Sequence, residues 1–395
     1  MQAARAVFTA FVLILGMAVT MAVTNVGHAS EWPPGTPALV ADLDTGRVIY
    51  AENATDPWFP ASLTKLMTAY VALDEARSGR IRMDSLLPVT ATAAAQPPSK
   101  MGFKAGSQIR LDNALLIIMV KSANDVAATI AEGLGGSIEG FAAKMNYHAA
   151  KLGMHDSFFT NPHGLPDLRK RTSARDMAIL ASALWREFPE QRALFGLDSI
   201  SFGSTVMRNH NGLVGRYAGT TGMKTGYICS SGFNVVATAE RNGRRLVTVI
   251  MGAPSAAERT TKSASLMEHG FASLGWAGAQ LASLPRSGKV EPVDLRPVIC
   301  GRRPPAGESD KDTGAVRAGT DAPLNLFTNR ALAFAGTGQA PTALPTVDLP
   351  ARGPARPIPV WLGSTPPGAK QPVTAASAAA PSRTGVPLPP RRPTL

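Results

Sequence analysis

The chain has 395 residues, and its 45% apolar and 17% charged content is typical of a globular protein rather than a disordered one. Its formal net charge of +12 does not indicate a nucleic-acid partner, because the basic residues are scattered and form no stripe with aromatic residues. If the protein is exported, a positive charge of this size would attract anionic wall polymers or lipid headgroups. The charge therefore allows peripheral contact with a membrane or with the wall.

Residues 1–29 have the pattern of a secretory signal peptide. Arg5 gives a positive start, residues 8–23 form an apolar run without charge, and small residues surround Ala29. An uncleaved membrane anchor is the alternative, but the run is shorter than the ~20 residues that span a bilayer. We therefore expect cleavage after about Ala29 and export to the periplasm or cell envelope.

The chain contains two cysteines, Cys229 and Cys300. In an oxidising compartment an even number of cysteines favours a disulfide. Neither cysteine lies in a C-x-x-C pair or near a histidine, which argues against zinc, and we expect neither a metal site nor a cofactor. A Cys229–Cys300 bridge would hold the segment around Cys300 against the preceding domain near Tyr227.

The expected elements are strands near both ends of the domain and a block of helices between them. Residues 37–52 resemble a hairpin, and an Asn-Gly pair between two β-branched runs predicts a second hairpin over 233–251. Helical periodicity predicts helices over 62–77, 111–134 (interrupted near Ser122), 138–152, 174–188 and 256–274. Strands at both ends of a helical block favour an α+β fold, in which an antiparallel sheet has flanking helices and a helical subdomain.

The composition changes after about residue 285. We expect a globular domain over 30–285, an extension over 286–310 that the disulfide would hold, and a disordered tail over 311–395 that is rich in Pro and Ala. The repeated prolines exclude an amphipathic anchor, so the tail is interpreted as a flexible cationic tether. Truncation after about Ala340 is then expected to leave catalytic turnover unchanged.

Three short motifs carry the chemistry. Ser62 and Lys65 form an S-x-x-K pattern, which on a helix places both side chains on one face. A Ser122-Ala123-Asn124 element ends a very apolar run, and Lys224-Thr225-Gly226 precedes a strand-like segment. Each motif taken alone is equally well explained by a helix cap or a solvated loop.

The order and spacing of the three motifs match the S-x-x-K, Ser-x-Asn and K-T-G signature. With these motifs, and with the segments 59–68, 122–125 and 161–165, the chain resembles the low-molecular-mass penicillin-binding proteins that act as serine-type D-alanyl-D-alanine carboxypeptidases. The similarity covers roughly residues 35–275 and implies the β-lactamase-like transpeptidase fold. It shows neither a second β-domain nor a C-terminal amphipathic anchor.

The resemblance implies a mechanism of acyl transfer. Ser62 would attack the carbonyl of the penultimate D-Ala of a peptidoglycan stem peptide and form an acyl-enzyme that water hydrolyses. Lys65 would take the serine proton in its neutral form, which burial and the nearby cation of Lys224 favour. Ser122 would relay the proton to the leaving amine, and β-lactam antibiotics would act as inhibitors.

The resemblance also implies a set of substrate-binding residues. Asn124 would hold the peptide group of the substrate, and the terminal carboxylate would lie on the K-T-G strand with help from Arg259. The backbone N–H groups of Ser62 and Tyr227 would form the oxyanion hole. The implied substrate-binding residues are Asn124, Lys224, Thr225, Gly226, Tyr227 and Arg259.

Other functions remain open to different degrees. A class A β-lactamase would need a glutamate that activates the deacylating water, and none lies between Glu139 and Glu187. The motifs do not separate a D,D-carboxypeptidase from a D,D-endopeptidase. A non-catalytic wall-binding homologue is a further alternative, but it would be marked by a broken motif, and none of the three is broken here. The chain departs from the family in carrying Thr220 and Thr221 where an acidic residue is common, and His163 is expected to be structural.

Overall fold

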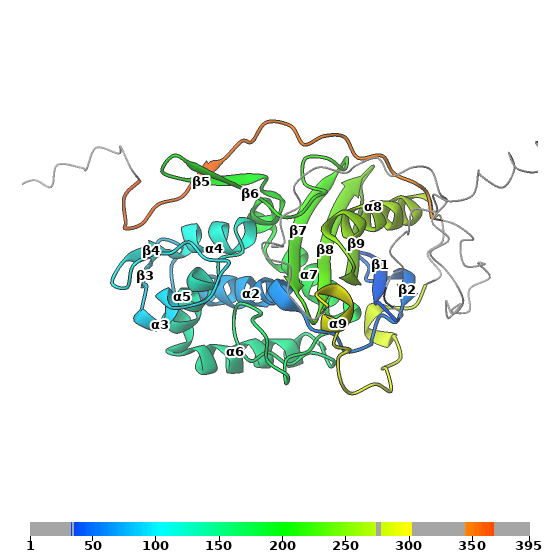
Figure 1. Ribbon diagram of the computed structural model, residues 1–395, viewed down its shortest axis with the longest axis horizontal. Coiled ribbons are helices and arrows are strands. Elements are labelled where there is room, and N and C mark those ends of the chain that lie inside the picture. The colour runs from blue at the N-terminus through cyan, green and yellow to red at the C-terminus, as the bar shows by residue number, and fades with distance from the viewer. Residues whose placement is uncertain (1–32, 34, 274–277, 302–343, 367–395) are drawn as a thin grey trace, which may run out of the picture.

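The computed structural model describes residues 33, 35–273, 278–301 and 344–366, drawn in colour in Figure 1. The expected signal segment 1–29 lies outside these residues, as do residues 302–343 and 367–395 of the expected tail. Among the described helices, none combines the length and apolar character needed to cross a membrane.

A five-stranded antiparallel sheet forms the centre of the molecule, with strand order β2-β1-β9-β8-β7. The N-terminal hairpin lies beside strands that come two hundred residues later in the chain, so both expected hairpins are confirmed as parts of one sheet. Its strands are β1 (Ala38–Asp42), β2 (Val48–Glu52), β7 (Thr220–Ile228), β8 (Gly232–Arg241) and β9 (Arg244–Ala253).

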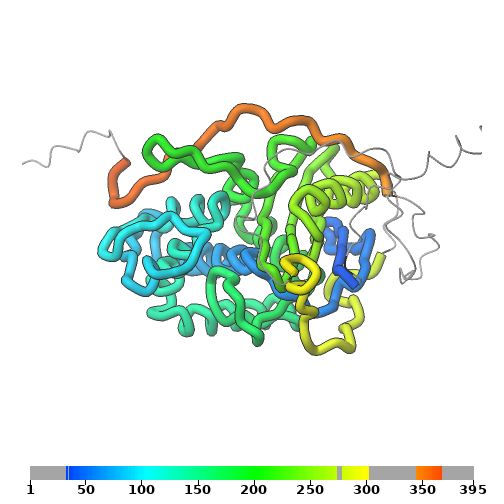
Figure 2. The backbone as a smooth tube through the Cα atoms, viewed as in Figure 1, coloured from blue at the N-terminus to red at the C-terminus, as the bar shows by residue number. Residues whose placement is uncertain are grey.

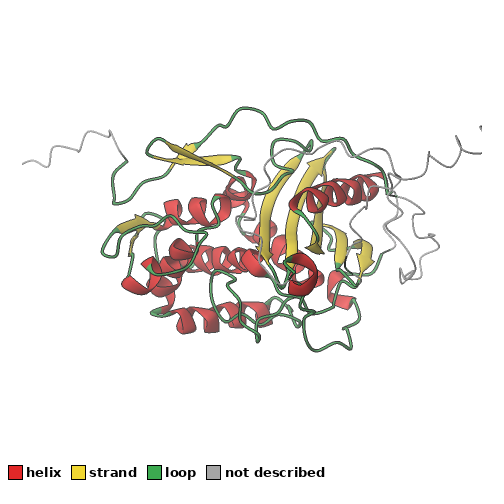
Figure 3. Ribbon diagram, in the orientation of Figure 1, coloured by secondary structure: helices red, strands yellow, loops and turns green. Residues whose placement is uncertain are grey.

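Helices cover both faces of this sheet, as Figure 3 shows. Alternate residues of β1 enter different cores: Leu39 belongs to the core that includes α2 and α7, whereas Val40 belongs to the core that includes α8. The longer helices are α2 (Thr64–Arg77), α4 (Leu111–Val120), α5 (Asn124–Gly135), α6 (Ile138–Lys151), α7 (Ala174–Glu187) and α8 (Ala256–Ala272). The fold is therefore α+β, as expected.

Serine side chains fix the starts of three of these helices. Ser137, Ser173 and Ser255 each accept a hydrogen bond from the backbone N–H three residues later, at the first turns of α6, α7 and α8. The expected helix over 111–134 is two helices, because Ser122 adopts a φ of +61° between α4 and α5. This break places Ser122 at a corner rather than along a helix side.

Shorter elements complete the fold. A two-stranded sheet pairs β3 with β4, and a three-stranded sheet has the order β10-β5-β6. These elements are η1 (Ala61–Leu63), β3 (Leu86–Pro88), α3 (Ala91–Ala94), β4 (Gln108–Arg110), η2 (Pro189–Gly196), β5 (Ser199–Phe202), β6 (Thr205–Arg208), η3 (Leu281–Ser283), α9 (Arg296–Ile299) and β10 (Ile358–Pro359).

The segment that follows α8 returns to the sheet through a disulfide. Cys229 and Cys300 are bonded, with an S–S distance of 2.02 Å, which confirms the expected bridge. The hydroxyl of Tyr227 lies 3.3 Å from the sulfur of Cys300, so the bridge holds α9 against the end of β7 as expected. The backbone N–H of Leu295 also donates to the carbonyl of Ser230.

Residues 344–366, which we call the strap, differ from the expectation of a disordered tail. The strap runs in extended form from the α8 side of the molecule across to β5, β4 and α4, as the orange tube of Figure 2 shows. Its apolar residues contact the two cores, and β10 pairs in parallel with β5. The expectation of disorder was wrong for these residues. It was based on the average composition, which is dominated by proline, whereas a few apolar residues between the prolines pack against the cores: Leu344, Val347, Leu349, Val360 and Leu362. Truncation after Ala340 would remove these contacts, so a neutral effect on turnover is no longer expected.

Candidate active site

The S-x-x-K motif lies on a tight turn that leads into α2. Ala61, directly before Ser62, has a φ of +47°, and η1 turns the chain so that α2 begins at Thr64. Lys65 lies one turn from Ser62, and its Nζ is 3.1 Å from the Ser62 Oγ. The expected pairing of these two side chains is therefore present in the structure.

Lys65 is completely buried, with 0% of its surface exposed. Its Nζ donates to the Oγ of Ser62, to the Oδ1 of Asn124 at 2.8 Å and to the carbonyl of His163 at 2.7 Å. A neutral amine could keep the last two bonds with its two N–H groups and offer its lone pair to the Ser62 hydroxyl. The geometry thus serves both protonation states that a general base must pass through.

Ser122 places a buried hydroxyl near Lys65 and Asn124. Only 4% of the residue is exposed, and within the described part of the chain its Oγ has no hydrogen-bond partner. A buried hydroxyl without a partner costs about 1–3 kcal/mol, so such groups are rare unless a ligand or a reacting proton meets them. Ser122 stands two residues before Asn124, which contacts Lys65 directly.

Asn124 makes contacts that the sequence did not predict. Besides accepting from Lys65, its side-chain amide donates to the carbonyl of Pro97 at 2.9 Å. One amide N–H remains after this bond, because the group carries two. Asn124 therefore links the start of α5 to Lys65 and keeps a single donor for the substrate peptide expected there.

The K-T-G motif lies on β7 directly beside the Ser62 turn. A Cβ atom added to Gly226 would lie 2.8 Å from the Ser62 backbone nitrogen and 3.0 Å from the carbonyl of Pro60. Only glycine permits this approach, and it sets the Tyr227 backbone next to that of Ser62. Lys224 and Thr225 are buried on the same strand, and the Lys224 Nζ donates to the carbonyl of Thr225.

Arg259 is held inside the fold rather than at its surface. The residue is on α8 and is buried, and its guanidinium donates to the carbonyls of Asn234 (3.4 Å) and His210 (3.1 Å). Asn234 is the residue of β8 that pairs with Gly226 of β7. Arg259 therefore braces the strand behind the K-T-G motif and the segment around His210.

A loop over residues 161–165 also packs on the Ser62 turn. A Cβ atom at Gly164, whose φ is +92°, would lie 1.9 Å from the carbonyl oxygen of Ala61. The Thr68 hydroxyl donates to the carbonyl of Pro162, and the carbonyl of His163 receives the bond from Lys65. The loop thus presents backbone carbonyls to α2.

The imidazole of His163 takes a structural place, as expected. Burial, followed by the charges of Lys65 and Lys170, lowers the pKa of His163 to about 2. The ring is therefore neutral at working pH, and its Nδ1 accepts the backbone N–H of Leu165. The carbonyl of the residue, and not its ring, contacts the site.

Lys170 is a residue that the sequence did not single out. Only 2% of it is exposed, and its Nζ donates to the Oδ1 of Asn161 and to the carbonyl of Leu165. Burial lowers its pKa to about 7, although the charge of Asp167 acts in the opposite direction. A basic Arg-Lys-Arg run in a loop has the pattern of a solvated surface, so the sequence offered no signal for this role.

The sequence pattern of the D-alanyl-D-alanine carboxypeptidase family matches residues 33–255, more than half of the chain. The chain belongs to this family. Among its relatives, D-alanyl-D-alanine carboxypeptidase DacA of Haemophilus influenzae is 32% identical over 239 residues, which cover 59% of this chain and 61% of that protein. DacC of Escherichia coli is 32% identical over 240 residues, covering 59% and 60%. The chain therefore spans about three fifths of the length of these relatives.

Solved structures of penicillin-binding proteins share the fold. Penicillin-binding protein 5 from Haemophilus influenzae has a TM-score of 0.58 at 32% identity, over 61% of this chain and 72% of that one. Penicillin-binding protein 6B from Escherichia coli has a TM-score of 0.57 at 31% identity, over 63% and 81%. The resemblance to low-molecular-mass penicillin-binding proteins, and the fold inferred from it, are confirmed.

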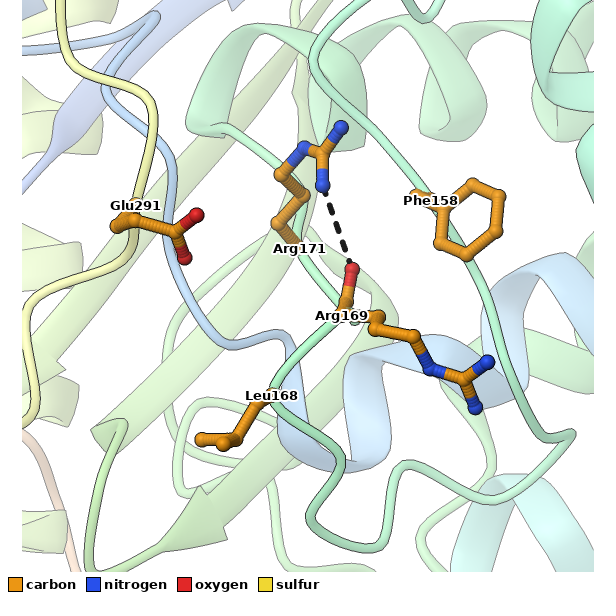
Figure 4. A pocket seen from close by; sticks show the side chains of 5 residues that line it. All are labelled: Phe158, Leu168, Arg169, Arg171 and Glu291. Atoms are coloured by element: carbon orange, nitrogen blue, oxygen red, sulfur yellow. Dashed lines mark hydrogen bonds between the residues drawn. The ribbon is translucent and has the colours of Figure 1, made fainter.

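A separate surface hollow of about 410 Å³ lies farther along the loop that carries the family's Asn161–Leu165 segment. Figure 4 shows its lining of Phe158, Leu168, Arg169, Arg171 and Glu291, with Arg171 donating to the carbonyl of Arg169. None of the motif residues lines this hollow. Among the described residues, no group of His, Cys, Asp and Glu side chains could hold a metal ion.

Proposed function

We propose that this protein is a serine D,D-carboxypeptidase that removes the terminal D-Ala of peptidoglycan stem peptides through an acyl-enzyme on Ser62. The observation that carries the proposal is the Ser62–Lys65 pair, in which the buried lysine donates to Asn124 and the serine lies directly beside Gly226 of the K-T-G strand. Membership of the family supports the same activity.

In the acylation step, the Oγ of Ser62 bonds to the carbonyl carbon of the penultimate D-Ala and the C–N bond to the terminal D-Ala breaks. Neutral Lys65 receives the hydroxyl proton, and Ser122 passes a proton to the leaving amine. The buried hydroxyl of Ser122 supports this relay, because it has no partner among the described residues and the reaction gives it one. Water then hydrolyses the ester and restores Ser62.

The K-T-G strand binds the end of the substrate. Lys224 and Thr225 meet the terminal carboxylate, and the backbone N–H groups of Ser62 and Tyr227 stabilise the oxyanion, each contributing about 3 kcal/mol. The close approach of Gly226 to Ser62 supports this pairing of donors from two elements. Arg259 supports the strand from behind by its bonds to main-chain carbonyls. β-Lactams would acylate Ser62 through the same groups.

The test is exposure to benzylpenicillin followed by peptide mass spectrometry, together with turnover of a pentapeptide that ends in D-Ala-D-Ala. We expect one adduct on the peptide that carries Ser62 and a loss of at least ~10³-fold in turnover for Ser62→Ala. Ser283→Ala, at an exposed serine, is the matched control and should behave as the wild type. An adduct on another residue, or turnover that survives in Ser62→Ala, would contradict the proposal. Crosslinked wall fragments offered in parallel distinguish an endopeptidase.

We further infer that the protein works outside the cytoplasmic membrane, because residues 1–29 have the pattern of a signal peptide. The basic residues beyond 366, namely Lys370, Arg383, Arg391 and Arg392, would hold it to anionic wall polymers or lipids. Amino-terminal sequencing of protein from the periplasmic fraction should begin near Ser30. A mature chain that retains residues 1–29 would contradict cleavage.

A further inference from the structure

The strap joins two parts of the molecule that carry different motifs. At one end Val360, with 3% of its surface exposed, enters the same core as α4, the helix that leads to Ser122. The backbone N–H of Gly363 donates to the carbonyl of Gln108, just before α4. At the other end the strap packs beside the sheet, where Arg216 donates to the carbonyl of Pro350 at 2.8 Å.

Between these ends, Arg352 holds the backbone of residues 209–211. Its Nη1 donates to the carbonyl of Asn209 at 2.8 Å, and its Nη2 donates to the carbonyl of Asn211 at 2.5 Å. The carbonyl of His210, between them, accepts from Arg259. Three consecutive carbonyls are thus held by two guanidinium groups, which reach the segment from α8 and from the strap.

The same segment is joined to the K-T-G strand. Asn211 is buried, and its side-chain amide donates to the carbonyl of Gly222 on β7 at 3.2 Å. Gly222 stands two residues before Lys224 on that strand. A shift of residues 209–211 would therefore move a contact of Arg259 and a contact of β7 together.

We propose that Arg352 is a positioning residue for the part of the site that binds the substrate carboxylate, acting through residues 209–211 on Arg259 and β7. The inference rests on the proposed function. Arg352 lies outside residues 33–255, so the family match does not account for it. A planar fork with several fixed N–H donors suits two carbonyls separated by one residue, which a single ammonium group cannot reproduce.

The test compares two reactive thioester substrates that differ only at the carboxylate: one ends in a free carboxylate and the other in its methyl ester. In the full chain, Arg352→Ala should lower kcat/KM for the free carboxylate about tenfold, mainly through KM, and leave the methyl ester within about twofold. Arg352→Lys should recover at most part of the loss, because one ammonium group cannot hold both carbonyls in the geometry of the guanidinium fork. Arg356→Ala removes the same charge from an exposed position of the strap and should leave both substrates unchanged.

A second measurement does not depend on turnover. Amide hydrogen exchange at Leu213 and Val214, which donate to the side chain and the carbonyl of Asn211, should be faster in Arg352→Ala than in Arg356→Ala. Equal exchange in the two variants, or equal loss on both thioesters, would overturn the positioning role. A wild-type enzyme that acts on neither thioester would overturn the proposed function instead, and the exchange experiment would still decide the role of Arg352.

Discussion

The loop at residues 161–165 and the strap at 344–366 are both irregular segments that basic side chains hold in place, yet they support the site differently. The loop touches the Ser62 turn itself, through Gly164 and the carbonyl of His163. The strap contacts the elements around the site, namely segment 209–211 and the core that holds α4, and not the Ser62 turn itself. Substitutions in the loop should therefore lower both the free energy of unfolding and the acylation rate. Substitutions in the strap should have smaller effects, each on stability or on substrate binding alone.

The largest effect is expected at Gly164. In Gly164→Ala the new methyl group would overlap the carbonyl of Ala61, 1.9 Å away, at a φ of +92°. We expect a loss of about 3 kcal/mol or more in the free energy of unfolding, with slower acylation by benzylpenicillin in the folded fraction. Denaturant titration and acylation kinetics measure the two quantities.

Gly203→Ala is the matched control for this change. Gly203 also has a positive φ, +57°, but a Cβ atom there would meet nothing within 4 Å. Its substitution should cost only about 1 kcal/mol, from backbone strain, and leave acylation unchanged. Equal losses in the two variants would show that the contact with the Ser62 turn does not matter.

The disulfide is expected to make the next largest contribution to the free energy of unfolding. One of its two cysteines, Cys300, lies outside the residues that match the family. Replacing Cys229 and Cys300 by alanine opens a loop of 71 residues and should lower the free energy of unfolding by about 2–4 kcal/mol. The acylation rate of the folded enzyme should change little, since the bridge holds α9 rather than the Ser62 turn. Thermal unfolding of wild type with and without reductant provides the control, and equal melting temperatures would contradict the prediction.

Much of the site could be predicted because its parts are local patterns. Ser62 and Lys65 lie one helical turn apart, and the spacing of the three motifs is characteristic enough for the amino-acid sequence alone to indicate the family. The two hairpins follow from β-branched runs and an Asn-Gly turn. The sequence also indicated the break at Ser122, because a polar residue interrupts an otherwise apolar run.

What could not be predicted depends on contacts between distant residues. Lys170 lies in a basic run that looks solvated, and only the packing of the loop reveals that it is buried. Arg352 lies among prolines, where average composition indicates disorder. Arg259 likewise donates to main-chain carbonyls, and such bonds cannot be predicted from the sequence because every residue carries a carbonyl.

A smaller effect is expected where the strap enters the core. Val360→Ala should lower the free energy of unfolding by about 1–2 kcal/mol, because Val360 is 3% exposed and loses buried methyl groups. Ile358→Ala, two residues earlier and 39% exposed, should cost less than about 0.5 kcal/mol. Denaturant titration of both variants makes the comparison. Equal small losses would mean that the strap does not stay bound in solution.

The last effect concerns the pH dependence of stability at Lys170. Burial lowers the pKa of Lys170 from 10.5 to about 7, while Asp167 acts in the opposite direction and the neighbouring His163 is neutral. Between pH 7 and 10.5 the unfolded chain therefore binds a proton at Lys170 that the folded chain does not. The free energy of unfolding consequently receives a contribution that rises with pH in this window and is lost as the pH falls to about 7.

Lys170→Met removes this contribution while retaining a side chain of similar length. Measured by denaturant titration at pH 7 and pH 9.5, the stability of wild type relative to Lys170→Met should increase with pH. Lys151→Met, at an exposed lysine on α6, should show no such trend relative to wild type. If the difference between wild type and Lys170→Met stays constant, Lys170 keeps an ordinary pKa, and the loop is then held by a fully charged ammonium at every pH of interest. In that case the loop and the strap would be held in the same way, by permanent cations on backbone carbonyls, and their difference would lie only in how directly each touches the Ser62 turn.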